Sequence, residues 1–230
     1  MLHYKKSEWR ITVTGRCILC AVRTAELDPE HPGIMERMPP LRREKLARLK
    51  RAEDRQRSVC AELALQAAFA LWGAKPLAYA CGEKGRPVLP EPWDLSLSHS
   101  GGIGLAALAD TPVGVDVERM ERPFGSLRRK LCSFAEQDVP EKELVQLWTA
   151  KEAYLKLTGE GLSVPMNMLT AEGGCLVRDG KKEAVLTRFS YPHDYSITLA
   201  SRIPVEAQLH IFTPDDVLQL LCSRERIYHD

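Results

Sequence analysis

Apolar residues along this chain alternate with polar ones in several short segments and recur at helical spacing in two longer ones. The first part has one long helical stretch, residues 41–72, with a predicted break near 52–54. Period-two or continuous apolar runs predict strands there, namely residues 17–23, 94–98, 103–109 and 113–118. Because only short turns separate the last three, we expect an antiparallel meander that ends on residues 113–118.

The second part of the chain again combines one major helix with several strands. Helical patterns occupy residues 126–132 and 141–157, and Gly159 marks the end of the second. Alternating apolar residues then predict four strands and a closing amphipathic helix, namely 175–177, 184–189, 195–200, 207–212 and 214–222. Two clusters of strands, each with a major helix, predict an α+β fold of two halves, residues 1–112 and 113–230.

Composition places the chain among ordinary globular proteins. Its 230 residues are 44% apolar with a formal net charge of +1, so no overall field attracts nucleic acid or a membrane surface. No apolar run approaches the ~20 residues of a membrane span, and the polar first residues do not resemble a secretion signal. We therefore expect a cytoplasmic protein whose seven cysteines are reduced. Cys17 and Cys20 form a C-x-x-C that we interpret as part of a buried strand.

Four charged residues in the second part are spaced for a shared site. Asp116 and Glu118 are two residues apart in a predicted strand, so they share one face of it. Glu152 and Lys156 are four residues apart in a predicted helix and likewise share a face. If the faces meet, three carboxylates and a lysine converge on a site for Mg²⁺ or Mn²⁺ and an anionic substrate. The spacing alone also fits a solvated strand face and an ordinary helical ion pair.

Basic and polar residues in the first part suit phosphate binding. Arg42 and Lys45 lie on one side of a helical turn, where they either clamp a phosphate or form a solvated face. Ser98 and His99 are adjacent in a strand and point to opposite faces, so His99 is not placed to activate Ser98 as in a hydrolase. Hydrogen bonding to a phosphate suits them better, although a lone histidine is commonly structural. The sequence has no phosphate-loop or dinucleotide-binding fingerprint.

Taken in order, these segments resemble the Sfp-type 4′-phosphopantetheinyl transferases of the holo-carrier-protein synthase superfamily. The resemblance runs from about Pro40 to Pro165. Its most specific pieces are G-x-D-x-E at Gly114–Glu118 and W-x-x-K-E-A-x-x-K at Trp148–Lys156. The weaker pieces, which occur in the matching order, are Leu41–Lys45, Arg51–Ser58, Gly85–Pro87, Leu95–Ser100 and Gly159–Ser163.

The resemblance implies two similar α/β halves related by a pseudo-twofold axis, with coenzyme A in the cleft between them. It implies transfer of the 4′-phosphopantetheine arm to a serine of an apo acyl or peptidyl carrier protein, with release of adenosine 3′,5′-bisphosphate. The implied Mg²⁺ ligands are Asp116, Glu118 and Glu152. The implied catalytic residues are Glu152, Lys156 and Asp116. These three would also contact the coenzyme, together with Arg42, Lys45, Ser58, Gly85, Arg86, Ser98 and His99.

Four positions depart from the family pattern. Arg42 and Arg86 stand where lysine is common, Ser58 where threonine is common, and Glu160 where a basic residue is common. The sequence leaves fatty-acid, polyketide and nonribosomal-peptide carriers open. It also leaves two other functions open, a metal-dependent hydrolase of coenzyme A and a non-catalytic module that binds coenzyme A or a carrier protein. We expect a monomer, because two fused halves would complete the site.

Overall fold

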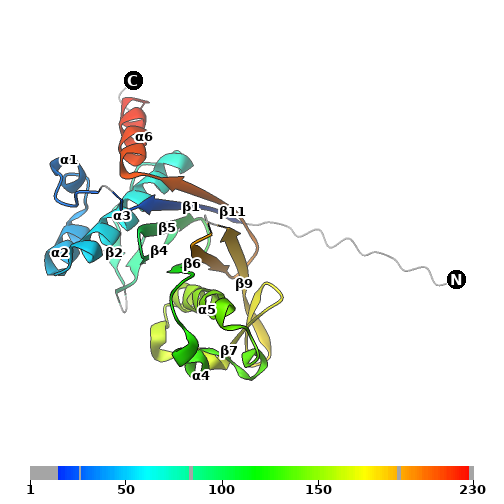
Figure 1. Ribbon diagram of the computed structural model, residues 1–230. Coiled ribbons are helices and arrows are strands. Elements are labelled where there is room, and N and C mark those ends of the chain that lie inside the picture. Colours follow the sequence, from blue (N-terminus) through cyan, green and yellow to red (C-terminus); the bar gives the residue numbers. More distant parts are fainter. Residues whose placement is uncertain (1–14, 26, 83–84, 191–192, 228–230) are drawn as a thin grey trace.

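A computed structural model of the chain describes residues 15–25, 27–82, 85–190 and 193–227 (Figure 1). Its first sheet has the strand order β11 (Val205–Phe212), β1 (Gly15–Arg23), β5 (Ile103–Ala109) and β4 (Asp94–Ser100). β1 pairs with β11 in parallel and with β5 antiparallel, and β4 pairs antiparallel with β5. The long helix α3 (Ala52–Trp72) covers one face of this sheet and forms an apolar core with it.

The second sheet is antiparallel throughout. Its strand order is β6 (Val113–Arg119), β10 (Tyr195–Ser201), β9 (Lys181–Ser190), β8 (Cys175–Arg178) and β7 (Leu169–Glu172). Helix α5 (Leu144–Thr158) covers one face, and it ends, as the sequence predicts, at Gly159, whose φ of 71° is left-handed. Short 3₁₀ turns flank this half at Gly125–Leu127, Phe134–Glu136, Glu141–Glu143, Gly161–Ser163 and Met166–Met168.

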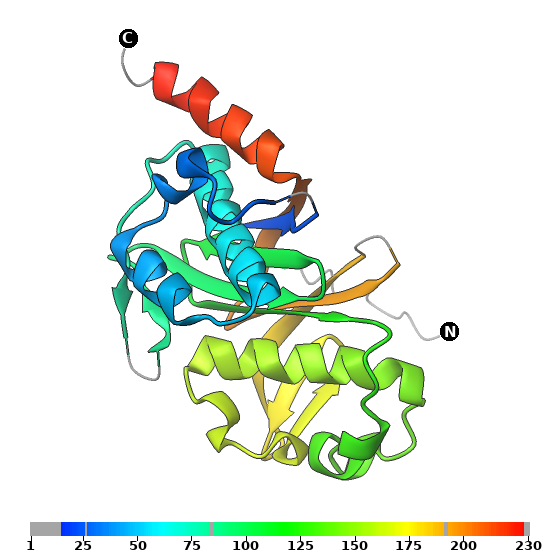
Figure 2. The ribbon, with the colours of Figure 1, turned by 60° about the vertical axis from the view of Figure 1, so that its left-hand side comes forward.

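The two sheets pack face to face between the two long helices (Figure 2). Alternation along the strands produces these layers. In β1, Ile18 and Cys20 point to the core under α3, whereas Cys17 and Leu19 point to the second sheet. Cys17 and Cys20 are therefore buried on opposite faces as free thiols, and burial raises the pKa of both. The C-x-x-C is thus a feature of strand packing.

Smaller elements complete the fold, and two of them, α2 and the β2–β3 hairpin, line the pocket described below. They are α1 (Pro32–Met35), α2 (Pro40–Arg48), the hairpin of β2 (Ala80–Cys81) and β3 (Pro87–Val88), α4 (Arg128–Leu131) and α6 (Pro214–Ile227). Helix α6 packs on α3. Among the described residues, no helix is long and apolar enough to cross a membrane.

Most of the predicted elements are confirmed, but two expectations need correction. The helical break falls at residues 49–51 instead of 52–54. The expected meander is wrong for its third strand, because β6 pairs with β10 of the second sheet instead of with β5. The other edge of β5 is already taken by β1, so β6 has no backbone edge to join there.

The chain passes from β5 of the first sheet to β6 of the second through residues 110–112, and the division into two halves at residue 112 stays a prediction. The end of the chain, however, returns to the first sheet through β11, which pairs with β1. The fold is therefore a mixed α/β arrangement in which the last strand and helix complete the first half, and the pseudo-twofold relation of the halves stays a prediction.

The seam between the sheets explains how β6 is held. Four side chains on alternate positions of β4 accept hydrogen bonds from the backbone N–H groups along the free edge of β6. We call these contacts the seam ladder, and its rungs run from Val113 to Asp94 (2.8 Å), Val115 to Ser96 (3.0 Å), Val117 to Ser98 (3.4 Å) and Arg119 to Ser100 (3.3 Å). Side chains thus satisfy a strand edge that would otherwise lack partners.

Candidate active site

Strand β6 and helix α5 meet at close range, which is the condition that the residue spacing left open. Gly114 makes this approach possible, because a Cβ at that position would overlap the backbone carbonyl of Ala153 and the backbone nitrogen of Leu157. Thr149 holds the same helix to the second sheet, since its hydroxyl lies 2.8 Å from that of Ser196 and 3.1 Å from that of Thr198. The two motifs therefore lie against each other.

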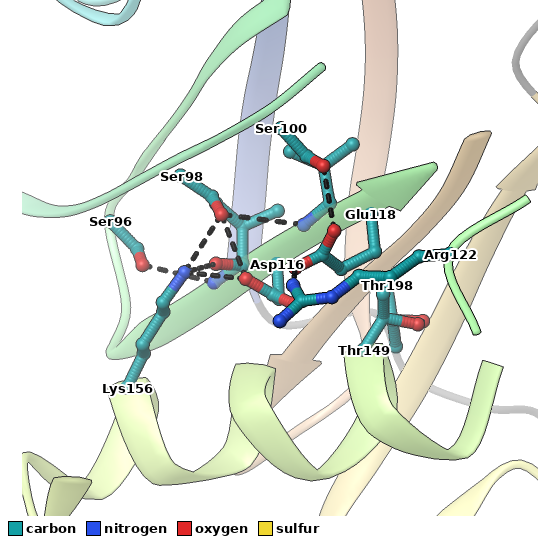
Figure 3. Close-up of polar contacts among 11 residues, drawn as sticks. Ser96, Ser98, Ser100, Asp116, Glu118, Arg122, Thr149, Lys156 and Thr198 are labelled. Carbon is teal, nitrogen blue, oxygen red and sulfur yellow. Dashed lines mark hydrogen bonds and ion pairs between the residues drawn. The ribbon is translucent and has the colours of Figure 1, made fainter. Parts of the chain in front are cut away.

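Lys156 and Asp116 form the first contact between the two faces (Figure 3). Lys156 Nζ donates to Asp116 Oδ1 at 2.7 Å, to Ser98 Oγ at 2.8 Å and to the carbonyl oxygen of Val115 at 3.1 Å. Ser98 in turn donates to Asp116 Oδ1 at 2.8 Å. The other carboxylate oxygen, Asp116 Oδ2, is buried and has no hydrogen-bond partner among the described residues. An oxygen of this kind is suited to an added cation.

Glu118 is held by a different pair of side chains. Ser100 donates to Glu118 Oε2 at 2.6 Å, and Arg122 Nη1 forms a short ion pair with Glu118 Oε1. The Arg122 guanidinium also stacks 5.1 Å from the ring of Phe124 and 5.5 Å from that of Trp148. Figure 3 shows Arg122 reaching back toward Glu118 from beyond the end of β6. The spacing of residues in the sequence does not indicate this internal cation.

Glu152 lies beside the other two carboxylates without an ion pair of its own to the described residues. Burial raises the pKa of Glu152, and Asp116 raises it further, while Lys156 opposes the shift. Within the described ranges, no three His, Cys, Asp or Glu side chains form a ready-made group that could hold a metal ion. Lys156 and Arg122 instead contact one oxygen each of Asp116 and Glu118.

A pocket of about 780 Å³ brings most of the expected residues together. Its reactive wall carries Asp116, Glu118, Trp148, Glu152 and Lys156. Its basic wall carries Leu41, Arg42, Lys45, Gly85, Ser98 and His99. Cations and carboxylates thus line one cavity, which suits a ligand with phosphates at both ends and a metal cation at one.

Arg42 is part of a buried network on the basic wall. Its Nε donates to Glu62 Oε2 at 3.0 Å and its Nη1 to Ser58 Oγ at 3.2 Å, and Tyr79 donates to the same Glu62 oxygen at 2.7 Å. Ser58 is 1% exposed and does not line the pocket; here it supports Arg42, and its contact to a coenzyme stays a prediction. Lys45 is exposed, and desolvation, followed by the charge of Arg42, lowers its pKa.

Arg86 also departs from the expectation. The flanking residues Gly85 and Pro87 line the pocket, but Arg86 does not. Its guanidinium pairs with Asp94 at 2.8 Å and donates to the carbonyl oxygen of Leu157 at 3.1 Å. The expected contact between Arg86 and the adenosine end of a coenzyme is therefore not supported by the direction of its side chain.

His99 sits on the pocket wall among cations. The ring keeps contact with solvent, yet partial desolvation, followed by the charges of Lys45, Arg57 and Lys156, lowers its pKa to about 4. The imidazole is neutral at pH 7 in the free protein. A bound phosphate would oppose the effect of these cations, so His99 is suited to donate a hydrogen bond to an anion.

Known proteins with similar sequences decide which family this site belongs to. The family model described as the 4′-phosphopantetheinyl transferase superfamily matches residues 112–200, which include both motifs of the reactive wall. The chain belongs to this superfamily. A 4′-phosphopantetheinyl transferase of Bacillus pumilus is 30% identical over 154 residues, which cover 60% of this chain and 66% of that protein.

Two Bacillus subtilis relatives extend the match. A 4′-phosphopantetheinyl transferase is 26% identical over 182 residues, covering 71% of this chain and 81% of that protein. The 4′-phosphopantetheinyl transferase Sfp is 24% identical over 165 residues, covering 66% of this chain and 72% of that protein. The matches thus span about two thirds to four fifths of these three relatives.

One charged residue of the superfamily motif turns away from the pocket. Lys151, next to Glu152, is fully buried, donates to the carbonyl oxygen of Leu131 at 2.7 Å and forms a short ion pair with Glu136. Desolvation lowers the pKa of Lys151, and the bond to Glu136 opposes that shift. Glu136 also accepts from the backbone of Ser133 and of Ala171. Lys151 thus ties α5 to the loop before it, a role that spacing alone does not reveal.

Proposed function

We propose that this protein transfers the 4′-phosphopantetheine arm of coenzyme A to a serine of an apo carrier protein and releases adenosine 3′,5′-bisphosphate. The single observation that carries the proposal is the junction of β6 with α5. There Asp116, Glu118, Glu152 and Lys156 line one pocket together with the cations of the basic wall. The names of the relatives, all 4′-phosphopantetheinyl transferases, support the same reaction.

The walls suggest how coenzyme A is oriented. Lys45 and Arg42 on the basic wall would receive the 3′-phosphate and His99 a neighbouring oxygen, because all three line the same pocket and the first two are cations. The diphosphate would then lie toward Lys156 on the reactive wall. An ammonium at this point neutralises charge on the diphosphate and on the leaving bisphosphate.

The donor chemistry of the reactive wall fits a hard divalent cation. Asp116 Oδ2 is buried without a hydrogen-bond partner among the described residues. Burial, followed by the charge of Asp116, raises the pKa of Glu152, which a bound cation would oppose. Asp116, Glu118 and Glu152 would hold Mg²⁺, or Mn²⁺ in its place. When bound, the ion supplies charge neutralisation at the diphosphate. Arg122 would have to leave Glu118 Oε1 for that oxygen to become a ligand.

The chain's own residues then assist a substitution at phosphorus. The serine hydroxyl of the carrier forms a bond to the phosphorus that bears the pantetheine arm, while the bond from that phosphorus to the bridging oxygen breaks. Glu152 would accept the hydroxyl proton, because it is the carboxylate of the wall that has no internal cation partner among the described residues. Lys156 would stabilise the bridging oxygen as it leaves.

A single experiment separates this function from its rivals. The protein is mixed with coenzyme A, Mg²⁺ and a panel of apo carrier proteins of the fatty-acid, polyketide and nonribosomal-peptide types. A mass gain of one phosphopantetheine on a carrier serine is the expected result. Release of phosphopantetheine into water without a carrier would instead identify a hydrolase, and coenzyme A binding without any turnover would identify a binding module. Either of those results would overturn the proposal.

We also propose that the protein works as a monomer in the cytoplasm. Both walls of the pocket come from one chain, and its last strand, β11, completes the first sheet. All seven cysteines are free thiols in the structure, as in a reducing compartment. Light scattering coupled to size-exclusion chromatography should give the mass of one chain, and the mass of a dimer would refute the monomer.

A further inference from the structure

We propose that Arg86 is a positioning residue for the reactive wall instead of a contact to coenzyme A, an inference that rests on the transferase function proposed above. The observation behind it is that one guanidinium joins three elements. Arg86 follows the β2–β3 hairpin loop, Asp94 begins β4, and Leu157 lies in the last turn of α5. The residue before Leu157 is Lys156, the cation of the reactive wall.

The guanidinium of Arg86 donates its hydrogen bonds to groups of the protein itself. Nη2 donates to Asp94 Oδ1 at 3.0 Å and to Oδ2 at 2.8 Å, and Nη1 donates to the carbonyl oxygen of Leu157 at 3.1 Å. The side chains of Arg86 and Asp94 are only 28% and 20% exposed. The carboxylate neutralises the guanidinium at close range, so little of its charge is left to attract a phosphate.

Asp94 connects this pair to the rest of the site. It is the first rung of the seam ladder, where its Oδ2 accepts from the backbone N–H of Val113 at 2.8 Å. The third rung is Ser98, which contacts both Lys156 and Asp116. Arg86 therefore holds the start of β6, through Asp94, and the end of α5, through Leu157, in one fixed relation. That relation sets where Lys156 meets Asp116.

The choice of arginine follows from this geometry. The last carbonyls of a helix lack intrahelical donors, and a cation near that end is favourable. A planar guanidinium can serve a carboxylate and such a carbonyl at the same time, whereas an ammonium is a single point charge on a flexible stem. Arginine in place of the lysine common at this position is thus explained by a bridging role, which a phosphate contact would not require.

The test compares Arg86→Gln, Asp94→Asn and the double variant. We expect each single variant to lower kcat by roughly tenfold to a hundredfold through misplacement of Lys156, with the double variant no worse than the poorer single one. The ratio of coenzyme A affinity to dephospho-coenzyme A affinity, from calorimetry, should stay unchanged in all three. If Arg86 binds the 3′-phosphate, Arg86→Gln alone will lower that ratio and Asp94→Asn will not, which would overturn the proposal.

Two further variants guard against trivial explanations. Arg202→Gln is the matched control, because Arg202 likewise donates to a carboxylate and a carbonyl, both of Glu183, but on an exposed surface away from the pocket. It should leave kcat unchanged. Arg86→Lys keeps the charge, should fold even if Arg86→Gln does not, and is expected to recover only part of kcat. Full recovery by lysine would contradict the bridging role.

A readout without any carrier protein separates this inference from the transferase function. Hydrogen exchange of the backbone amides in residues 155–159 should rise in Arg86→Gln and in Asp94→Asn but stay unchanged in Arg202→Gln. If the unmodified protein shows no transfer to any carrier while this exchange still rises, the transferase function fails and the link from Arg86 to α5 stands. Unchanged exchange in both variants would remove the link itself.

Discussion

Each wall of the pocket, basic and reactive, carries two kinds of charged side chain. Some already form an ion pair within the protein, and one on each wall does not. On the basic wall, Arg42 has the buried carboxylate of Glu62, whereas Lys45 makes no hydrogen bond or ion pair to the described residues. On the reactive wall, Asp116 has Lys156, while Glu152 has no such partner within the described ranges. The comparison teaches that the paired charges build the pocket, and that the unpaired ones are free to meet a ligand.

The largest effect is expected when Glu152, the carboxylate of the reactive wall without an ion pair to the described residues, is replaced. Glu152→Gln should lower kcat by about 10²–10⁴-fold, because it removes the proposed base, while coenzyme A affinity changes little. Stopped-flow transfer assays and calorimetry measure the two quantities separately. Glu172→Gln, at an exposed position of β7, is the matched control. Equal losses of binding and turnover would show that Glu152 acts only as a ligand.

The second prediction separates the geometry of the reactive wall from its charges. Gly114→Ala introduces a methyl group that overlaps the backbone of α5, so it should push β6 from the helix and reduce stability by about 1–3 kcal/mol. Turnover should fall as well, although no charge has changed. Thermal and urea unfolding measure the stability.

The control for that change is another glycine. A Cβ at Gly102 would meet its nearest neighbours at 3.6 Å, an ordinary contact distance, so Gly102→Ala should be nearly neutral. If Gly114→Ala proves as stable and active as Gly102→Ala, the close approach of β6 to α5 is not needed for the reaction.

The third prediction concerns Lys45, the cation of the basic wall that makes no hydrogen bond or ion pair to the described residues. Lys45→Ala should weaken coenzyme A binding by about tenfold to a hundredfold, as expected for one hydrogen bond to a charged group, and dephospho-coenzyme A much less. Lys50→Ala, at an exposed position outside the pocket, is the control. Similar losses for both ligands would refute the assignment to the 3′-phosphate.

Arg42→Ala is expected to behave differently from Lys45→Ala. It leaves the Glu62 carboxylate buried without its cation, so it should lower the free energy of unfolding by about 3–5 kcal/mol. A drop in coenzyme A affinity in that variant therefore has to be read together with its melting curve. If Arg42→Ala is fully stable, the paired charges do not build this wall.

The sequence predicted those parts of the site that depend on local periodicity. The faces of β6 and α5 follow from spacings of two and four residues, and Lys156 does meet Asp116. Contacts between residues that are far apart in the sequence were not predicted. β11 returns to lie parallel to β1, and β6 leaves the meander because hydroxyls nineteen positions earlier satisfy its edge. The alternating serines 96, 98 and 100 were the available signal for that seam.

The sequence also did not predict which way some of the side chains point. Ser58 and Arg86 stand at coenzyme-binding positions of the family pattern, although their residue types differ from it, yet both contact neighbouring protein groups. A motif fixes which residue is present, whereas its partner depends on what lies across the fold, here Arg42 and Asp94. Arg122 lies four residues beyond Glu118 in a turn, where no helical or strand period indicates a contact.

The smallest expected effect tests whether the internal cations of the reactive wall compete with a metal. Arg122→Gln frees Glu118 Oε1 and should strengthen Mn²⁺ binding to the protein, measured by calorimetry without coenzyme A. Arg122 is 47% exposed, and exposed ion pairs contribute about 0.2–1 kcal/mol, so the gain should be about fivefold at most. Arg119→Gln, which removes an exposed pair with Glu121, should leave the affinity unchanged. Weaker Mn²⁺ binding in Arg122→Gln would mean that this arginine supports the metal site instead of competing for it.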